Sequence, residues 1–169
     1  MIIVGIDPGT RHLGWGVIDA VGTRLTHVAN GIVHTHVQES LGSRLCEIDD
    51  ALLALIERHR PAEAAVESLF FAKDPQAASK LGHARGVVLL RLARAAIPTF
   101  EYPPATIKQS LVGRGGADKR QVAMMVKTLL GLRELPGADA TDALAAAITH
   151  AHIARVDRVL QAGRVPRGD

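Results

Sequence analysis

The sequence predicts an α/β fold in which a mixed five-stranded sheet is flanked by helices. Three β-rich runs near the N-terminus are separated by short turns, a pattern typical of an antiparallel meander. Two further β-rich runs alternate with long amphipathic stretches, which indicates strands joined by helical crossovers. With 47% hydrophobic and 22% charged residues, the composition is that of a globular protein. A length of 169 residues favours one domain, which we expect over residues 1–156. We expect residues 157–169 to form a flexible C-terminal tail.

The five expected strands are rich in apolar, aromatic or β-branched residues and span residues 2–7, 13–19, 25–35, 64–67 and 99–102. After the first strand, Asp7-Pro8-Gly9-Thr10 places Pro and Gly at favoured turn positions. The first three strands form the meander, so the open edge of the sheet lies beside strand one. Because crossover connections are right-handed, we expect the fourth strand at that edge, parallel to the first.

Five helices are expected in the remaining segments, over residues 41 to near 61, 75–96, 105–111, 118–130 and 139–156. The first is clearly periodic, because Leu41, Leu45, Ile48, Leu52 and Ile56 recur at helical spacing and form one apolar face. Together with the strands, these helices complete an α/β layer arrangement.

The composition excludes several classes of protein. The single cysteine, Cys46, cannot form a disulfide within the chain and has no neighbours spaced for zinc, so we expect a reducing, cytoplasmic setting. The N-terminal residues lack the basic region of a secretory signal. The longest apolar stretches, residues 86–97 and 143–152, are interrupted by Arg or His, so we expect no membrane-spanning segment.

The formal charge of +3 is distributed unevenly along the chain. Residues 73–133 contain eleven Lys or Arg and three acids, a balance of +8, whereas the remainder has nine basic and fourteen acidic residues, a balance of −5. Such a segment fits a surface that binds a polyanion. Solvated helix faces without a partner would give the same pattern, and charge alone leaves both alternatives open.

Four carboxylates are expected at the edge of the sheet where strands one and four end. Asp7 closes strand one and Glu67 closes strand four, and ligands of open α/β sheets gather outside the carboxyl ends of the strands. Asp139 and Asp142 are three residues apart on the last helix and therefore share a face. If these groups converge, their repulsion is relieved by protonation or by a bound cation.

Oxygen ligands without cysteine or clustered histidine favour Mg²⁺ or Mn²⁺ over zinc. Two such ions about 3.5 to 4 Å apart stabilise both oxygens of a displacement at phosphorus, so the acids predict metal-assisted phosphodiester hydrolysis. Each acid also has an ordinary structural interpretation. Asp7 would serve as a turn residue, and Asp139 and Asp142 as a cap and first-turn acid of the helix. Glu67 resists this interpretation, because an acid that closes a buried strand needs a partner.

Five motifs follow one another along the chain: Gly5-Ile6-Asp7-Pro8-Gly9, Glu67 followed by Phe70, Lys108, Gly113 to Lys119, and Asp139-Ala140-Thr141-Asp142-Ala143-Leu144-Ala145. Together they strongly resemble the RuvC family. RuvC proteins are bacterial crossover junction endodeoxyribonucleases with an RNase H-like fold, and they resolve Holliday junctions. The resemblance runs from about residue 2 to residue 153. Thr141 departs from it, since a small apolar residue is expected between the two aspartates.

The resemblance implies that Asp7, Glu67, Asp139 and Asp142 are catalytic acids that bind two Mg²⁺ ions per active site, with Mn²⁺ able to substitute. Some relatives have His at the position of Asp142. It also implies symmetric paired nicks in four-way (Holliday) junction DNA, in homologous recombination and DNA repair. The implied partners are a second copy of the chain, a hexameric branch-migration motor and its junction-binding protein, of the RuvB and RuvA type. A two-fold symmetric junction independently favours a homodimer, and the helix expected over residues 75–96 is a candidate surface for it.

Basic residues near the acids are expected to contact DNA. Lys119 follows a glycine-rich segment that can approach DNA closely, and its ammonium group can neutralise charge on a transferring phosphoryl group, which makes it a catalytic candidate. Lys108, Arg114 and Arg120 are expected to contact backbone phosphates rather than bases.

Two aromatic residues follow Glu67 closely. Phe70, at the position that matches the family, is expected to stack on an unpaired base at the junction centre. For Phe71, base stacking and ordinary core packing remain alternatives.

Two other functions are compatible with parts of the sequence. Actin-like sugar and acetate kinases also begin with a strand, an Asp and a Gly/Thr turn, but they need two such domains, and 169 residues supply one. A non-catalytic junction-binding module would keep the fold without the chemistry, and the presence of all four acids argues against it. The leading hypothesis is a Mg²⁺-dependent, structure-selective DNA nuclease.

Overall fold

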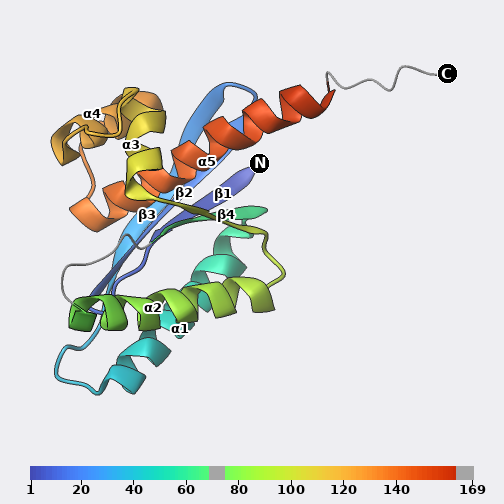
Figure 1. Cartoon of the computed structure of the whole chain (residues 1–169). Coiled ribbons are helices and arrows are strands. Elements are labelled where there is room, and N and C mark those ends of the chain that lie inside the picture. Colours follow the sequence, from blue (N-terminus) through green and yellow to red (C-terminus); the bar gives the residue numbers. More distant parts are fainter. Residues whose placement is uncertain (69–74, 163–169) are drawn as a thin grey trace.

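A central five-stranded sheet organises the chain (Figure 1). The computed structural model describes residues 1–68 and 75–162. The strands are β1 (Ile2–Asp7), β2 (His12–Val21), β3 (Arg24–His34), β4 (Glu63–Glu67) and β5 (Thr99–Tyr102). Their order in the sheet is β3-β2-β1-β4-β5. The first three strands pair antiparallel, whereas β4 pairs parallel with both β1 and β5, so the predicted mixed sheet is confirmed.

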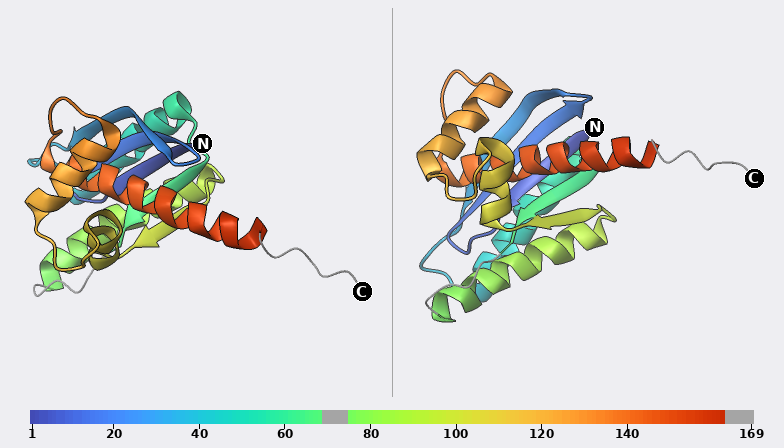
Figure 2. Two further views of the ribbon diagram at one scale, coloured as in Figure 1. Left: turned by 90° about the horizontal axis from the view of Figure 1, so that it is seen from above. Right: turned by 45° about the horizontal axis from the view of Figure 1, so that its top comes forward.

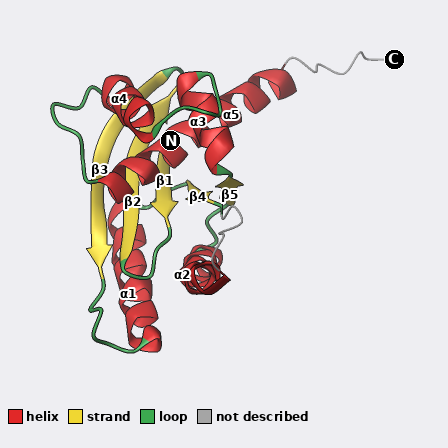
Figure 3. Cartoon of the chain, turned by 60° about the vertical axis from the view of Figure 1, so that its left-hand side comes forward, coloured by secondary structure: helices red, strands yellow, loops and turns green. Residues whose placement is uncertain are grey.

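Helices cover both faces of this sheet. They are α1 (Leu41–His59), α2 (Pro75–Arg94), α3 (Pro104–Val112), α4 (Lys119–Leu130) and α5 (Ala138–Ala162). Helices α1 and α2 lie on one face and α3, α4 and α5 on the other, as Figures 1 and 2 show. The three layers can also be followed in Figure 3.

Side chains alternate between two cores along each strand. Val4 and Ile6 of β1 are fully buried against α1 and α2, whereas Ile3 belongs to the core beneath α5. Because alternate residues share a face, Asp7 lies on the same side as Ile3 and therefore faces α5. By the same argument, Glu67 shares the α5 face with Ala65 of β4. The strand periodicity thus directs both carboxylates to one side of the sheet.

Helix α5 lies very close to β1 and β2 because glycines line its path. A methyl group built on Gly5 would stand 1.9 Å from the carbonyl oxygen of Ala143, and one built on Gly14 would stand 2.0 Å from that of Asp139. Only a residue without a Cβ atom fits at these contacts. Since Gly14 lies opposite Asp7 in the antiparallel pairing, the contact brings the start of α5 beside the end of β1.

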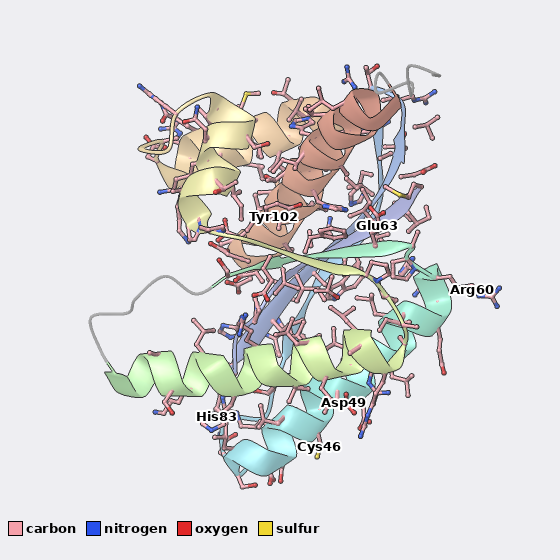
Figure 4. The ribbon with its side chains drawn as sticks, turned by 45° about the vertical axis from the view of Figure 1, so that its right-hand side comes forward. Cys46, Asp49, Arg60, Glu63, His83 and Tyr102 are labelled. Carbon is pink, nitrogen blue, oxygen red and sulfur yellow. The ribbon has the colours of Figure 1, made fainter. Side chains whose placement is uncertain are left out.

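A buried polar network ties the middle of α5 to β4 and β5. His150 is 1% exposed; its Nε2 lies 2.7 Å from Oε2 of Glu63, and its Nδ1 lies 2.7 Å from the hydroxyl of Tyr102. A carboxylate only accepts, so Nε2 carries the proton that it donates to Glu63, and the Tyr102 hydroxyl donates to Nδ1. Figure 4 shows Glu63 and Tyr102 on the two strands beside α5.

Helix α5 extends further toward the C-terminus than the sequence pattern predicts. It continues to Ala162, whereas the helix was expected to end near Val156 and residues 157–169 to form a tail. The reason is local: residues 157–162 contain no Gly or Pro, and Gly163 is the first helix-ending residue after them. The difference concerns only residues 157–162, because 163–169 lie outside the described residues. Within the described residues, none of the helices is long and apolar enough to cross a membrane.

Candidate active site

Asp7 and Glu67 end neighbouring parallel strands. The pairing of β1 with β4 runs from Ile3 opposite Glu63 to Ile6 opposite Val66, so each acid follows the last pair by one residue. Ile6 and Val66 are fully buried and anchor the two strand ends in the core, whereas Asp7 and Glu67 are half-buried. The strands therefore bring the two carboxylates to the same edge of the sheet, facing α5.

Helix α5 adds two further acids. It begins at Ala138, which places Asp139 in its first turn and Asp142 one turn later; both are half-buried. Thr141 between them is 4% exposed, and its hydroxyl donates a hydrogen bond to the carbonyl oxygen of Pro136 at 3.2 Å. This bond explains how a polar residue occupies a position where a small apolar one was expected.

A cavity of about 380 Å³ opens where the strand ends meet the helices. Three predicted acids, Asp7, Glu67 and Asp142, line it together with both predicted lysines, Lys108 of α3 and Lys119 of α4. Its apolar lining consists of Pro8, Leu81, Pro104, Ile107, Val122 and Ala145. The structure thus brings charged groups from β1, β4, α3, α4 and α5 around one cavity.

The fourth acid, Asp139, does not line this cavity. It borders a second, more open cavity of about 370 Å³, which it shares with Asp7. Asp7 is the acid that lines both spaces, together with Pro8 and Leu81.

Burial and neighbouring carboxylates raise the pKa values of Asp7 and Glu67. Burial, followed by the charges of Glu67, Asp142 and Asp139, raises the pKa of Asp7 to about 7. Burial and the charge of Asp142 also raise the pKa of Glu67. Lys119 opposes both shifts: its Nζ donates to Oδ2 of Asp142 at 3.1 Å, and this bond raises the pKa of Lys119 in turn.

This electrostatic balance fits a divalent cation. The four acids offer only carboxylate oxygens, the ligand type that Mg²⁺ and Mn²⁺ prefer, and within the described residues one lysine ammonium, that of Lys119, bonds to them. Throughout residues 1–68 and 75–162, no three His, Cys, Asp or Glu side chains stand close enough to hold one ion between them. Asp142 is instead bonded to Lys119, and Asp7 and Glu67 are the other acids of the same cavity.

Two further predicted DNA contacts, Arg114 and Arg120, are not brought into the cavity. Arg114 and Arg120 are exposed and belong to neither cavity lining in the described part of the chain. Phe70 and Phe71 lie outside the described residues, so base stacking by Phe70 stays a prediction and both alternatives for Phe71 remain.

Three basic residues beside the site escaped the sequence analysis. Arg11 and Lys80 line the second cavity, and Arg44 bonds the turn that follows Asp7. Arg11 could have been found, because it directly follows the Asp7-Pro8-Gly9-Thr10 turn. The only sequence signal for Lys80 is its place in the positively charged segment, residues 73–133. Arg44 had no local signal, since its contact depends on how α1 packs against that turn.

Known proteins resemble this chain in sequence and in fold. Residues 3–150 match the family model described as crossover junction endodeoxyribonuclease RuvC. The chain belongs to the RuvC family. The RuvC of Sorangium cellulosum is 54% identical, over 98% of this chain and 93% of that protein. The RuvC of Methylocella silvestris is 52% identical, over 94% of this chain and 89% of that protein.

Solved RuvC structures agree with the fold. The structure of T. thermophilus RuvC in complex with Holliday junction substrate superposes with a TM-score of 0.88 at 40% identity, covering 93% of this chain and 96% of that chain. The yeast mitochondrial Holliday junction resolvase has a TM-score of 0.66 at 11% identity, over 94% of this chain and 83% of that chain, a likeness of fold alone. The RNase H-like fold is therefore confirmed. RuvC proteins are divalent-metal-dependent nucleases that hydrolyse phosphodiester bonds.

Proposed function

We propose that this chain resolves four-way (Holliday) DNA junctions by symmetric paired nicks, through metal-assisted phosphodiester hydrolysis, in homologous recombination and DNA repair. One observation carries the proposal: Asp7, Glu67 and Asp142 share a cavity with Lys108 and Lys119 in a chain of the RuvC family. The solved relative bound to a Holliday junction supports the choice of substrate.

The metal-binding residues are Asp7, Glu67, Asp139 and Asp142, which would hold two Mg²⁺ ions per site, with Mn²⁺ able to substitute. Bound divalent ions supply stabilisation of the negative charge on the attacking and leaving oxygens. The raised pKa of Asp7 supports this role. It means that the Asp7 carboxylate lacks nearby positive charge, which a bound cation would supply. The sheet carries Asp7 and Glu67, and helix α5 carries Asp139 and Asp142, so both pairs of ligands stand on regular secondary structure.

Lys119 acts beside the acids. Its side chain is 82% exposed while its Nζ is held by Asp142, so the ammonium group stands at the cavity and can meet the phosphoryl group being cut. A cation held in place before the reaction stabilises charge that develops in the transition state. Lys108 lowers the pKa of Glu67 and is placed to orient a backbone phosphate.

The functional unit is proposed to be a homodimer, because symmetric cuts in opposed strands of a four-way junction require two sites related by the same axis. Helix α2 is the proposed pairing surface. Its Leu90 is 51% exposed, although it is a large apolar side chain. A cytoplasmic location and cooperation with a RuvB-type motor and a RuvA-type junction-binding protein belong to the same proposal.

The deciding experiment compares wild type with Asp7→Asn on a synthetic four-way junction, in Mg²⁺ and in EDTA. Only wild type with Mg²⁺ should give symmetric nicks, and both proteins should bind the junction. A linear duplex of the same sequence serves as the substrate control. Equal cutting by Asp7→Asn would contradict the assignment of the site, and binding without any cutting by wild type would favour a non-catalytic junction-binding module.

A further inference from the structure

The second cavity has a basic side. Besides the acids Asp7 and Asp139, it is lined by Arg11 from the β1–β2 turn, by His12 at the start of β2 and by Lys80 from α2. All three basic side chains are exposed. The first cavity also carries cations, Lys108 and Lys119, so basic groups border Asp7 in both spaces.

The turn that carries Arg11 is held rigidly. The hydroxyl of Thr35 donates to the carbonyl oxygen of Thr10 at 2.8 Å, and the amide of Thr35 donates to that of Arg11 at 3.1 Å. Arg44 of α1 donates to the Thr35 hydroxyl at 3.2 Å and also to the Thr10 carbonyl. The backbone at Arg11 is therefore fixed before any ligand arrives, which lowers the entropy cost of binding through its side chain.

The fold does not use the charges of Arg11 and Lys80. Two arginines of α2 form ion pairs with neighbouring elements in the described part of the chain. Arg91 pairs with Asp49 of α1, and Arg85 pairs with Glu101 of β5. Arg11 and Lys80 take part in none of the ion pairs found within the described residues. Their charges are thus available to an anion that enters the second cavity.

We propose that Arg11 and Lys80 form a subsite for a backbone phosphate of the cut strand, next to the phosphate that reacts at Asp7. This inference rests on the proposed function. DNA that reaches Asp7 and Asp139 must approach two carboxylates, and cations in the same cavity offset that repulsion. A guanidinium matches phosphate geometry and a lysine adds a point charge, so the subsite positions the strand without reading its bases.

Arg11→Gln, Lys80→Gln and the double variant test the subsite. Junction binding is measured by fluorescence anisotropy with Ca²⁺ replacing Mg²⁺, at several salt concentrations. Each single change should weaken binding and reduce the slope of log K against log salt by about 0.9, and the double change by roughly twice that. Arg24→Gln is the matched control, because Arg24 is exposed at the β2–β3 turn, at the opposite end of the sheet. It should bind as wild type does.

The conservative pair Arg11→Lys and Lys80→Arg distinguishes charge from misfolding, because both variants should regain most of the affinity. A double variant that keeps the wild-type melting temperature, affinity and salt slope would overturn the subsite. Weaker binding with an unchanged slope would also overturn it, since no phosphate contact would have been lost. Either result leaves intact the proposed function, which depends on cutting by wild type and its loss in Asp7→Asn.

Discussion

Asp7 is the residue on which the charges of the site converge. Its pKa, about 7, lies far above the ordinary value for a carboxyl group because of burial and the carboxylates of Glu67, Asp142 and Asp139. A folded-state pKa above the unfolded value means that ionising Asp7 destabilises the metal-free fold. That destabilisation is absent below about pH 4, grows as the pH rises toward 7, and is complete above it.

Asp7→Asn should therefore stabilise the metal-free protein at high pH. In EDTA at pH 8 we expect a gain on the order of 2 kcal/mol, or roughly 4 to 8 °C in melting temperature, and a smaller gain at pH 5. Differential scanning calorimetry at the two pH values measures it, with the exposed Glu39→Gln as a control. A gain of equal size at both pH values would show that ionisation of Asp7 is not its cause.

Lys119 has the opposite influence, because it lowers the pKa values of Asp7 and Glu67. Lys119→Met should move the rising limb of the cleavage pH profile to higher pH and reduce the rate by about 10²- to 10³-fold. Single-turnover cleavage between pH 6 and 9 measures both effects. Lys127→Met, in the last turn of the same helix, should change neither. A lower rate with an unchanged pH profile would show that Lys119 does not control the ionisation of Asp7 and Glu67 during cleavage.

At the scale of elements, the sequence predicted the order of the first four strands and the parallel pairing of the fourth with the first, but not the position of β5 in the order or the height of α5 above the sheet. Asp7 and Glu67 could be placed because strand ends and crossover handedness are local or topological rules. The distance of Asp139 from Asp7 depends on a close contact between Gly14 and the backbone of α5. Such a contact joins segments far apart in the chain, so no local pattern reveals it.

Gly5→Ala and Gly14→Ala should displace α5 and thereby the acids that it carries. The added methyl group has no space, so we expect a loss of about 1 to 3 kcal/mol in stability, together with a large fall in cleavage rate. Urea unfolding and junction cleavage measure the two effects. Gly42→Ala, in α1 with only a distant side-chain contact, should be neutral or slightly stabilising. Full activity in both variants would mean that the height of α5 does not control the site.

For the whole molecule, the structure separates the basic residues of the positively charged segment, residues 73–133, by whether they pair with acids of the fold. Arg85 and Arg91 are paired with acids of the fold, whereas Lys108 and Lys119 line the cavity of the acids. The charge balance predicted from the sequence contains both kinds, and nothing in the order of the residues separates them. Only the packing of α2 against α1 and β5 shows which charges remain for DNA.

The proposed homodimer is tested in solution. Sedimentation equilibrium at working concentrations should give the mass of two chains, and Leu90→Glu on α2 should shift the population toward monomers. Paired nicking should then become uncoupled, so that junctions with one nick accumulate. The exposed Leu53→Glu on α1 is the control and should leave the mass unchanged. A wild-type monomer would contradict the dimer, and an unchanged mass for Leu90→Glu would exclude α2 as its surface.

The site also joins the first strand of the chain to its last helix, since Asp7 lies in β1 and Asp139 and Asp142 in α5. During translation, a nascent chain acquires Asp7 almost at once, but the helix that completes the acid cluster emerges last. A polypeptide that ends before Asp139 therefore holds only Asp7 and Glu67 of the four acids. Under the proposed assignment of the site, the complete set of metal ligands exists only when synthesis has passed Asp142.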